Sequence, residues 1–315
     1  QRIFRKFNGN YMFPEAHAFA FGVTAYHMAW LKYYYPLEFF ISIFNQQPMG
    51  FYNLETLKED AKRHGVQVLN PDINHSLAKC IIKDESLLLG LLNIRDIGIT
   101  SASAIINSRT NNGSFSNLYQ VMQYTGLERH PIENLVRSGS LDNLIASRKQ
   151  ALSEINLRYR PPSEQMAMQL PIKQDMLLLP TETSEEIMQY EYNSLGIHPK
   201  GHLLLYLRKH IDKDILTSQD AMKFPDGRNV KVAGIVIRRQ RPLGKAIYMT
   251  LEDETGHTPL IIWPQVYRQL RLVLREPLLI INGIISRRDD TINIVVQNAR
   301  SLDYLKNPPK SKDWE

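Results

Sequence analysis

A pattern of short strands in the last third of the chain restricts the fold more than any other feature of the sequence. Five runs rich in β-branched and other apolar residues lie at 230–237, 246–251, 259–263, 278–285 and 291–296. Turn-forming residues separate them, and a helical stretch at 265–274 stands between the third and the fourth run. Five strands with a helix after the third are typical of a small closed β-barrel. Gly234 and Gly283 stand inside two of the runs, where closure of such a barrel needs bends.

This arrangement predicts an OB-fold, an architecture that binds oligonucleotides in many proteins. In the second run, the alternation of side chains places Ile247 and Met249 in the core and Tyr248 on the outer surface. The basic residues that we expect around this surface are Arg238, Arg239, Arg241, Lys245, Arg287 and Arg288. In a surface that binds single-stranded DNA, cationic side chains contact the phosphate backbone and an aromatic ring stacks on a base. All of these residues are therefore candidate DNA contacts. The alternatives are that the charges are merely solvated and that Trp263, near the same surface, is a core residue.

The middle of the chain has the features of a helix-hairpin-helix motif. Ile97 and Gly98 form a tight hairpin. The apolar helix that follows opens with Ile99, Thr100 and Ser101. Glycine lets the backbone come close to a phosphate, and the free NH groups at a helix start donate to its oxygens. Because such contacts hold DNA without reading its bases, we assign sequence-independent DNA binding to these five residues.

Asp96 departs from the usual form of this motif, which has glycine two residues before Gly98. Aspartate tolerates a left-handed backbone, but its charge stands close to the expected phosphate. A more degenerate second copy of the motif lies at 135–141. The alternative for both segments is an ordinary helical hairpin with a glycine turn.

Two aromatic-rich segments stand near the start of the chain. The first reads Phe-Pro-Glu-Ala-His-Ala-Phe-Ala-Phe at 13–21, and its helix runs on to Trp-Leu-Lys at 30–32 and Tyr-Pro at 35–36. The second reads Gln-Pro-Met-Gly-Phe-Tyr at 47–52. Together they resemble the fingers of bacterial DNA polymerases of the DNA polymerase III alpha (DnaE) type. The second segment resembles more narrowly the error-prone, ImuC-like translesion branch.

The resemblance covers essentially the whole chain, because that family also places a helix-hairpin-helix element and an OB barrel after its fingers. It implies the C-terminal part of a translesion polymerase that acts on primed template DNA in replication and repair. The family keeps its catalytic aspartates in a palm domain before the fingers, so no catalytic residue is expected in this chain. Magnesium is expected for the full-length polymerase, and no metal for this fragment. His17 is the candidate nucleotide-binding residue, and the alternative is a hydrogen-bonded core or surface histidine.

A segment between two prolines resembles the short peptides that bacterial polymerases insert into a sliding clamp. Its candidate clamp-binding residues are Gln174, Met176, Leu177 and Leu179. The customary aromatic residue at the end of such a peptide is absent, and the alternative is a linker strand that packs on its neighbour. Translesion accessory proteins are further expected partners of the branch.

The predicted fold class is multidomain α and β, with an all-helical fingers and helix-hairpin-helix region followed by a five-stranded OB-fold β-barrel. The predicted divisions are helical fingers at 1–75, the helix-hairpin-helix region at 76–145, a connector with helices at 146–225, the OB-fold at 226–305 and a tail at 306–315. The run from Pro14 to Tyr35 is apolar on nearly all sides, which predicts a buried helix. Asn53 is a good N-cap for a helix at 54–64, and Gly65 supplies its left-handed end.

Composition favours a polyanionic partner and a reducing compartment. The 315 residues carry a net charge of +6, and nucleic acid is the commonest partner of a basic globular chain. The one cysteine, Cys80, leaves no intrachain disulfide and fits the bacterial cytoplasm, with Cys80 itself as a core residue. No apolar run is long enough for a membrane span. The acids at 252–254 and 289–290 stand in turns, where we expect solvated side chains and no catalytic or metal-binding pair.

Two other interpretations stay open from the sequence. One is a non-catalytic module that binds single- and double-stranded DNA, which an upstream palm with paired aspartates would exclude. The other is an RNA-binding OB protein of the synthetase type, against which the hairpin motif and the fingers segments argue.

Overall fold

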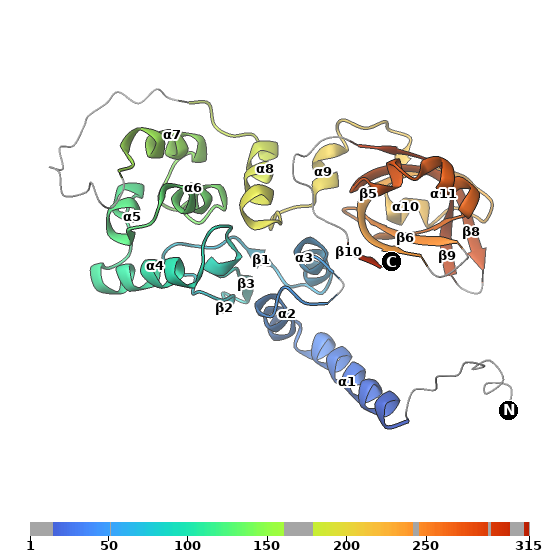
Figure 1. The fold of residues 1–315 in the computed structure, drawn as a ribbon, viewed down its shortest axis with the longest axis horizontal. Coiled ribbons are helices and arrows are strands. Elements are labelled where there is room, and N and C mark those ends of the chain that lie inside the picture. The colour runs from blue at the N-terminus through green and yellow to red at the C-terminus, as the bar shows by residue number, and fades with distance from the viewer. Residues whose placement is uncertain are drawn as a thin grey trace.

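The helices and the strands of the chain form two regions. The computed structural model describes residues 15–50, 52–160, 179–241, 246–288, 291–302 and 312–314. Figure 1 shows the helical region from blue to yellow and the barrel in orange and red beside it. The predicted fold class, helical regions followed by a five-stranded OB-fold barrel, is therefore confirmed.

The first three helices begin and end where the local sequence predicts. They are α1 (Glu15–Tyr34), α2 (Pro36–Asn45) and α3 (Leu54–Arg63). Pro36 occupies the first turn of α2, where its missing NH costs nothing. The side chain of Asn53 caps α3, because its Oδ1 accepts from the NH of Thr56 at 2.8 Å. Gly65 follows with a φ of +79°, so the predicted N-cap and left-handed end are both confirmed.

Helix α1 forms as predicted, but the prediction that it is buried is wrong. It has no buried residue in the described chain, and Phe19 is 74% exposed. Figure 1 shows the helix extending away from the other helices. Among the described residues its contacts are at its C-terminal end, where it meets α2 and where Lys32 Nζ lies 2.6 Å from Asp60. An apolar surface is buried only when another element covers it, and the sequence of the helix alone does not say whether one does.

The rest of the helical region combines a small sheet with five helices and a short connector to the barrel. Its elements are β1 (Val68–Leu69), β2 (Ile81–Lys83), β3 (Ser86–Leu88), a 3-10 helix (Leu91–Asn93), α4 (Ile99–Asn112), α5 (Leu118–Thr125), α6 (Arg129–Arg137), α7 (Arg148–Arg158), α8 (Ser184–Leu195), α9 (Leu203–Leu207) and α10 (Ser218–Ala221). The sheet, in the order β1-β3-β2, has no counterpart in the sequence-based prediction. One continuous core runs from Phe40 to Ile197, so the helices before and after position 75 share it. Cys80 lies in this core as predicted, and burial raises the pKa of its thiol to about 11.

The barrel closes through the strand order of an OB-fold. Its elements are β4 (Ile215–Leu216), β5 (Asn229–Gln240), β6 (Ile247–Glu252), β7 (His257–Ile262), α11 (Pro264–Leu270), a 3-10 helix (Val273–Arg275), β8 (Leu278–Arg288), β9 (Thr291–Ser301) and β10 (Lys312–Trp314). Strand β5 pairs with β6 along one half and with β8 along the other, and the order β5-β6-β7-β9-β8 returns to β5. The five predicted strands and the helix after the third are thus confirmed. Strand β10 lies parallel to the second half of β5.

Two glycines permit the close approach of strands that closure requires. A Cβ atom at Gly234 would lie 2.7 Å from the Cβ of Leu251, and one at Gly283 would lie 2.5 Å from the carbonyl oxygen of Val295. Both positions therefore exclude larger residues for steric reasons, as the barrel interpretation of the sequence implies. Among the helices that the structure describes, none combines the length and the hydropathy of a bilayer span.

Candidate nucleic-acid interface

The turn before α4 is built around Asp96 in a left-handed backbone. Its φ is +63°, which is the conformation that glycine adopts in the usual motif. Its carboxylate accepts from Asn134 Nδ2 at 2.9 Å, and the same amide donates to the carbonyl oxygen of Arg95 at 3.0 Å. Asn134 lies on α6, so this helix holds the turn in place. The acid is thus part of the architecture of the hairpin and is hydrogen-bonded within it.

The start of α4 is open to an anion. Gly98 is the N-cap, with a φ of −89°, and no side chain caps the helix. A Cβ atom at Gly98 would have no neighbour within 4 Å, and the first turn carries no acidic residue. Ile97 is buried and fixes the turn, whereas Ile99 is 75% exposed beside Thr100. Free NH groups and the positive end of the helix dipole therefore face open space, which is the geometry of a phosphate site.

Gly98→Val should weaken duplex DNA binding by roughly tenfold, because the added side chain occupies the space where a phosphate would meet the helix NH groups. The fold should be unaffected, since a φ of −89° suits valine and the position is sterically open. Fluorescence anisotropy at fixed salt measures the affinity, and circular dichroism the helix content. Ser103→Val, one turn further along the exposed side of α4, is the matched control. Equal affinity of Gly98→Val and the control would contradict a phosphate site here.

The second hairpin, at 135–141, does not repeat this geometry. Ser138 and Ser140 are buried, and Gly139 has a φ of +81° against the side chain of Arg148. The hairpin is closed by interior contacts, with no exposed helix start beside it. The phosphate-site geometry of the first hairpin is therefore not found in this segment, and a degenerate second copy of the motif stays a prediction.

The barrel presents two aromatic residues on one outer face. Gln240 of β5 stands opposite Tyr248 of β6, which in turn stands opposite Ile261 of β7. Tyr248 is 43% exposed, while its neighbours in β6 point into the core as predicted. Trp263 follows Ile261 by two positions, so it continues the same face, and it is 53% exposed. The interpretation of Trp263 as a core residue is therefore wrong, and its place in the period of the predicted run at 259–263 would have indicated its exposure.

The predicted arginines divide into two kinds by strand register. Arg238 stands opposite Thr250 and is exposed on the face of Tyr248. Arg239 stands opposite the buried Met249, and its guanidinium donates to the carbonyl oxygens of residues 274, 275 and 276 at 3.0, 3.0 and 2.9 Å. Arg287 similarly donates to the carbonyl oxygen of Phe224 at 2.9 Å. Both side chains thus stabilise chain turns, and a role in DNA contact stays a prediction for each.

The remaining predicted residues are placed as follows. Arg241 lies over the ring of Tyr267, 5.3 Å from its centre, and Arg288 is exposed at the end of β8. His17 is exposed in the first turn of α1, with its ring edge-on to the ring of Phe21 and the two ring centres 4.4 Å apart. The residues outside the described part of the chain are Lys245, Gln174, Met176 and Leu177, whereas Leu179 is half-buried.

Tyr248→Ala and Trp263→Ala should each weaken single-stranded DNA binding by about 1–3 kcal/mol if a base stacks on each ring. Duplex affinity should change much less, because the bases of a duplex are not free to stack on these rings. Tyr119→Ala provides the control, since that tyrosine has nearly the same exposure on α5 of the helical region. A loss as large for duplex as for single strands would show a general structural effect instead.

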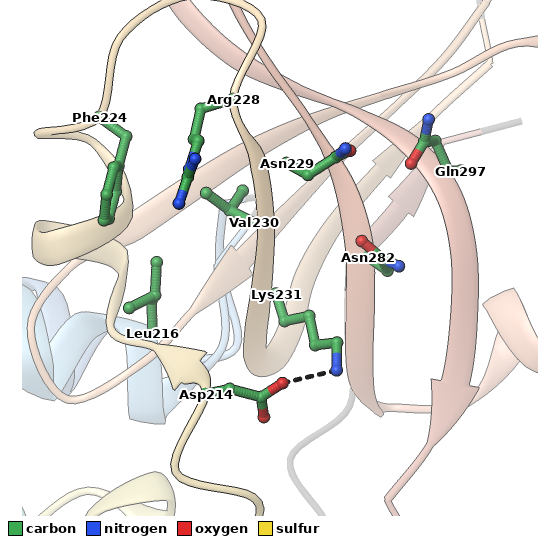
Figure 2. Close-up of a pocket in the computed structure, with 9 residues that line it drawn as sticks. All are labelled: Asp214, Leu216, Phe224, Arg228, Asn229, Val230, Lys231, Asn282 and Gln297. Atoms are coloured by element: carbon green, nitrogen blue, oxygen red, sulfur yellow. Dashed lines mark hydrogen bonds and ion pairs between the residues drawn. The ribbon is translucent and has the colours of Figure 1, made fainter.

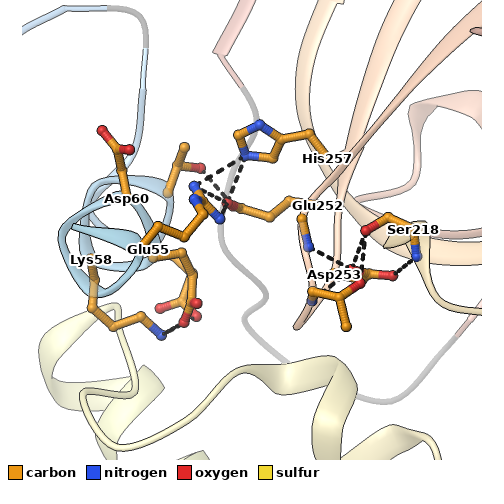
Figure 3. A network of polar contacts seen from close by, with 12 residues as sticks. Glu55, Lys58, Asp60, Ser218, Glu252, Asp253 and His257 are labelled. Atoms are coloured by element: carbon orange, nitrogen blue, oxygen red, sulfur yellow. Dashed lines mark hydrogen bonds and ion pairs between the residues drawn. The ribbon is translucent and has the colours of Figure 1, made fainter. Parts of the chain in front are cut away.

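The acids at 252–254 are not solvated, so the prediction is wrong for them, whereas the acids at 289–290 lie outside the described residues. The Glu252 side chain is fully buried, with Thr56 Oγ1 at 3.1 Å, His257 Nε2 at 2.9 Å and Arg63 at 3.3 Å. Thr56 and Arg63 belong to α3, so the carboxylate joins the helical region to the barrel (Figure 3). These donors replace the water that a turn acid normally keeps.

The carboxylate of Asp253 is also buried and hydrogen-bonded. It accepts from the NH of Ser218 at 2.6 Å and from the NH of Thr255 at 2.8 Å (Figure 3). Within the described ranges, no group of three or more His, Cys, Asp or Glu side chains is placed to hold a metal ion.

Comparisons with known proteins agree with both parts of this interface. Residues 65–151 match the family described as a helix-hairpin-helix motif, and residues 230–302 match the family described as an OB-fold nucleic acid binding domain. An asparaginyl-tRNA synthetase from Pyrococcus horikoshii is 22% identical over 24% of this chain and 20% of its own, with a TM-score of 0.22. That similarity is too low to support the synthetase alternative.

Curated relatives match nearly the whole chain. The error-prone DNA polymerase of Anaeromyxobacter dehalogenans (strain 2CP-C) is 31% identical over 96% of this chain and 28% of its own length. The error-prone DNA polymerase of Hahella chejuensis is 33% identical over 92% of this chain and 29% of its own length. The chain thus spans less than a third of the curated relatives that it matches. Over almost all of its length, the chain is similar to one part of the error-prone DNA polymerases.

Proposed function

We propose that this chain is the DNA-holding, C-terminal part of an error-prone polymerase III alpha-like subunit that acts in replication and translesion repair. The observation that carries this proposal is the similarity to error-prone DNA polymerases over 96% of the chain. The structure supports it with two surfaces of different chemistry, an open helix start at Gly98 and an aromatic face at Tyr248 and Trp263. The order of the two modules is also that of the polymerase family.

The two surfaces suit the two parts of a primed template. Backbone NH groups at α4 recognise phosphate without regard to sequence, as a polymerase requires of its duplex product. Exposed aromatic rings with Arg238 suit the unpaired template strand. The buried contact of Glu252 with Thr56 and Arg63 fixes α3 against the barrel, which lets both parts of one DNA molecule be held together.

Nucleotide transfer itself belongs, in this proposal, to the length of the relatives that this chain does not span. Magnesium would supply charge stabilisation to that reaction. We assign DNA binding and not catalysis to this chain, because the polymerase family keeps its catalytic aspartates in a palm domain before the fingers. His17, exposed near the start of α1, is proposed to contact the incoming nucleotide.

The partners that we propose are primed DNA, a sliding clamp and translesion accessory proteins, in the bacterial cytoplasm. Clamp binding is assigned to the segment that contains Gln174, Met176, Leu177 and Leu179, on its resemblance to clamp-binding peptides. The relatives named above are bacterial polymerases, which supports a bacterial setting.

Primer extension tests the proposal. The isolated 315 residues should bind primed template but incorporate no nucleotide with magnesium present. Joined to its upstream palm, the protein should extend primers, and His17→Ala should raise the Michaelis constant for nucleotide more than it changes DNA affinity. Extension by the isolated chain would show that the active site is misassigned. An inactive longer protein would instead favour the non-catalytic DNA-binding module.

A further inference from the structure

A groove of about 460 Å³ opens on the barrel, and none of the predicted DNA contacts is among the residues that line it (Figure 2). Strands β5, β8 and β9 contribute Asn229, Lys231, Asn282 and Gln297 to its lining. Strand β6, which carries Tyr248, contributes nothing to it. The groove is therefore separate from the aromatic face.

Three amide side chains from three neighbouring strands converge on this groove. Asn282 of β8 stands opposite Lys231 of β5. The register of β8 and β9 shifts directly after Asn282, so Gln297 is an extra residue of β9 at that point, and such bulges re-aim side chains. In the described part of the chain, the amides of Asn229, Asn282 and Gln297 have no hydrogen-bond partner. Each amide therefore has both a donor and an acceptor to offer a ligand.

The charges of the groove leave one cation available. Lys231 Nζ lies 2.6 Å from a carboxylate oxygen of Asp214, so that pair is neutralised (Figure 2). The guanidinium of Arg228 lies 5.8 Å from the centre of the Phe224 ring. Among the residues that the structure describes, it meets no carboxylate and no carbonyl oxygen. The groove thus combines one available cation, three amides and a phenyl ring.

We propose that this groove binds a nucleotide of single-stranded DNA, with a phosphate on Arg228 and a base edge against the amides. A nucleotide carries one negative charge and a polar edge of donors and acceptors, which these residues complement. The inference rests on the proposed function, because it gives the barrel a second contact with the same template strand. An uncharged oligosaccharide, the other ligand class of OB-folds, would use the amides but not the available charge of Arg228.

The length of β5 makes the proposal testable with oligonucleotides of two sizes. Strand β5 has 12 residues, with the groove at its start and the face of Tyr248 at its end. At about 3.3 Å per residue, its ends lie up to about 35 Å apart. A strand of about 5 nucleotides can occupy one site only, whereas one of about 16 nucleotides, at the upper end of OB site sizes, can reach both.

The test measures binding of thymidine oligonucleotides of these two lengths by fluorescence anisotropy over a series of salt concentrations. Arg228→Ala should weaken binding of the longer strand by roughly three- to tenfold and lower its salt slope by about 0.7, the value for one phosphate contact. Binding of the shorter strand should not change, because it is held at Tyr248. Asn282→Asp keeps the size of the side chain but adds a negative charge, and it should weaken the longer strand to a similar degree. Arg300→Ala, which removes an exposed cation of β9 that is paired with Asp212, is the control and should leave the slope unchanged.

The outcomes separate this inference from the proposed function. If Arg228→Ala and Asn282→Asp bind the longer strand as tightly as the parent while Tyr248→Ala binds it more weakly, the groove is not a nucleotide site. The proposed function would then be unaffected. Equal losses for both lengths would also overturn it, because they would show a general effect of charge or folding. Binding of a maltose oligosaccharide that Asn282→Asp abolishes, with DNA binding unaffected, would assign the groove to a carbohydrate instead.

Discussion

Lys58→Met is expected to lower the free energy of unfolding of the helical region by about 3–5 kcal/mol, the cost of removing one partner from a buried ion pair. Lys58 lies in α3 with no exposure, and its Nζ lies 2.8 Å from Glu55, 2.6 Å from Glu59 and 2.6 Å from the carbonyl oxygen of Gly201. Figure 3 shows the amine directed at Glu55. Without it, two buried carboxylates lose the positive charge between them, and the carbonyl oxygen of Gly201 loses this donor. Urea denaturation followed by circular dichroism measures the change.

Lys62→Met is the matched control on the same helix. Its ammonium lies 3.2 Å from the same Glu59 but is about one-third exposed, so its removal should cost less than about 1 kcal/mol. Burial by itself lowers the pKa of Lys58, but Glu55 and Glu59 outweigh it and raise the pKa above 10.5, so the amine is charged in the fold. A similar loss in both variants would contradict the role assigned to Lys58.

Acid is expected to destabilise the protein through His202, beginning near pH 6.5. The residue is buried, and its Nδ1 accepts from the NH of Leu204 at 3.1 Å at the start of α9. Burial holds the pKa of His202 well below 6.5, and the charge of Lys58 lowers it further. Below pH 6.5 the unfolded chain therefore binds a proton that the folded chain excludes. Stability attributable to this residue is present at pH 7 and falls below pH 6.5, by at most about 1.4 kcal/mol per pH unit.

His202→Asn isolates this effect from the other groups that titrate between pH 7 and pH 5. Asparagine keeps a side-chain acceptor for the helix start but has no proton to gain. The variant should therefore lose less stability than the parent between these two pH values, by at most about 2 kcal/mol, as measured by urea denaturation at each. Identical pH dependence of the two proteins would mean that His202 takes up its proton in the folded state.

The barrel and the helix ends follow from the sequence because their causes are local. Alternation of Ile247 and Met249 with Tyr248 reflects the two-residue period of a strand, which any half-buried strand must show. Asn53 and Gly65 bound α3 because a side-chain acceptor and a left-handed backbone satisfy helix ends wherever they occur. The open hairpin at Gly98 was likewise predictable, including the left-handed turn at Asp96.

Only the tertiary structure decided which apolar and charged groups are buried. The apolar faces of α1 are exposed, although their composition is that of an interior helix. Glu252 is buried because Thr56, 196 positions earlier in the chain, comes to lie beside it. Because of the strand register, Arg238 points outward and Arg239 donates to backbone carbonyl oxygens. The register also brings amide side chains from three strands to one groove. The sequence by itself therefore determined the five strands of the barrel and the ends of α3, since these depend on neighbours in the chain, but it did not reveal the small sheet β1-β3-β2. Whether a side chain is buried, and which groups it bonds to, depends on residues far apart in the chain, and only the packed fold brings those residues together.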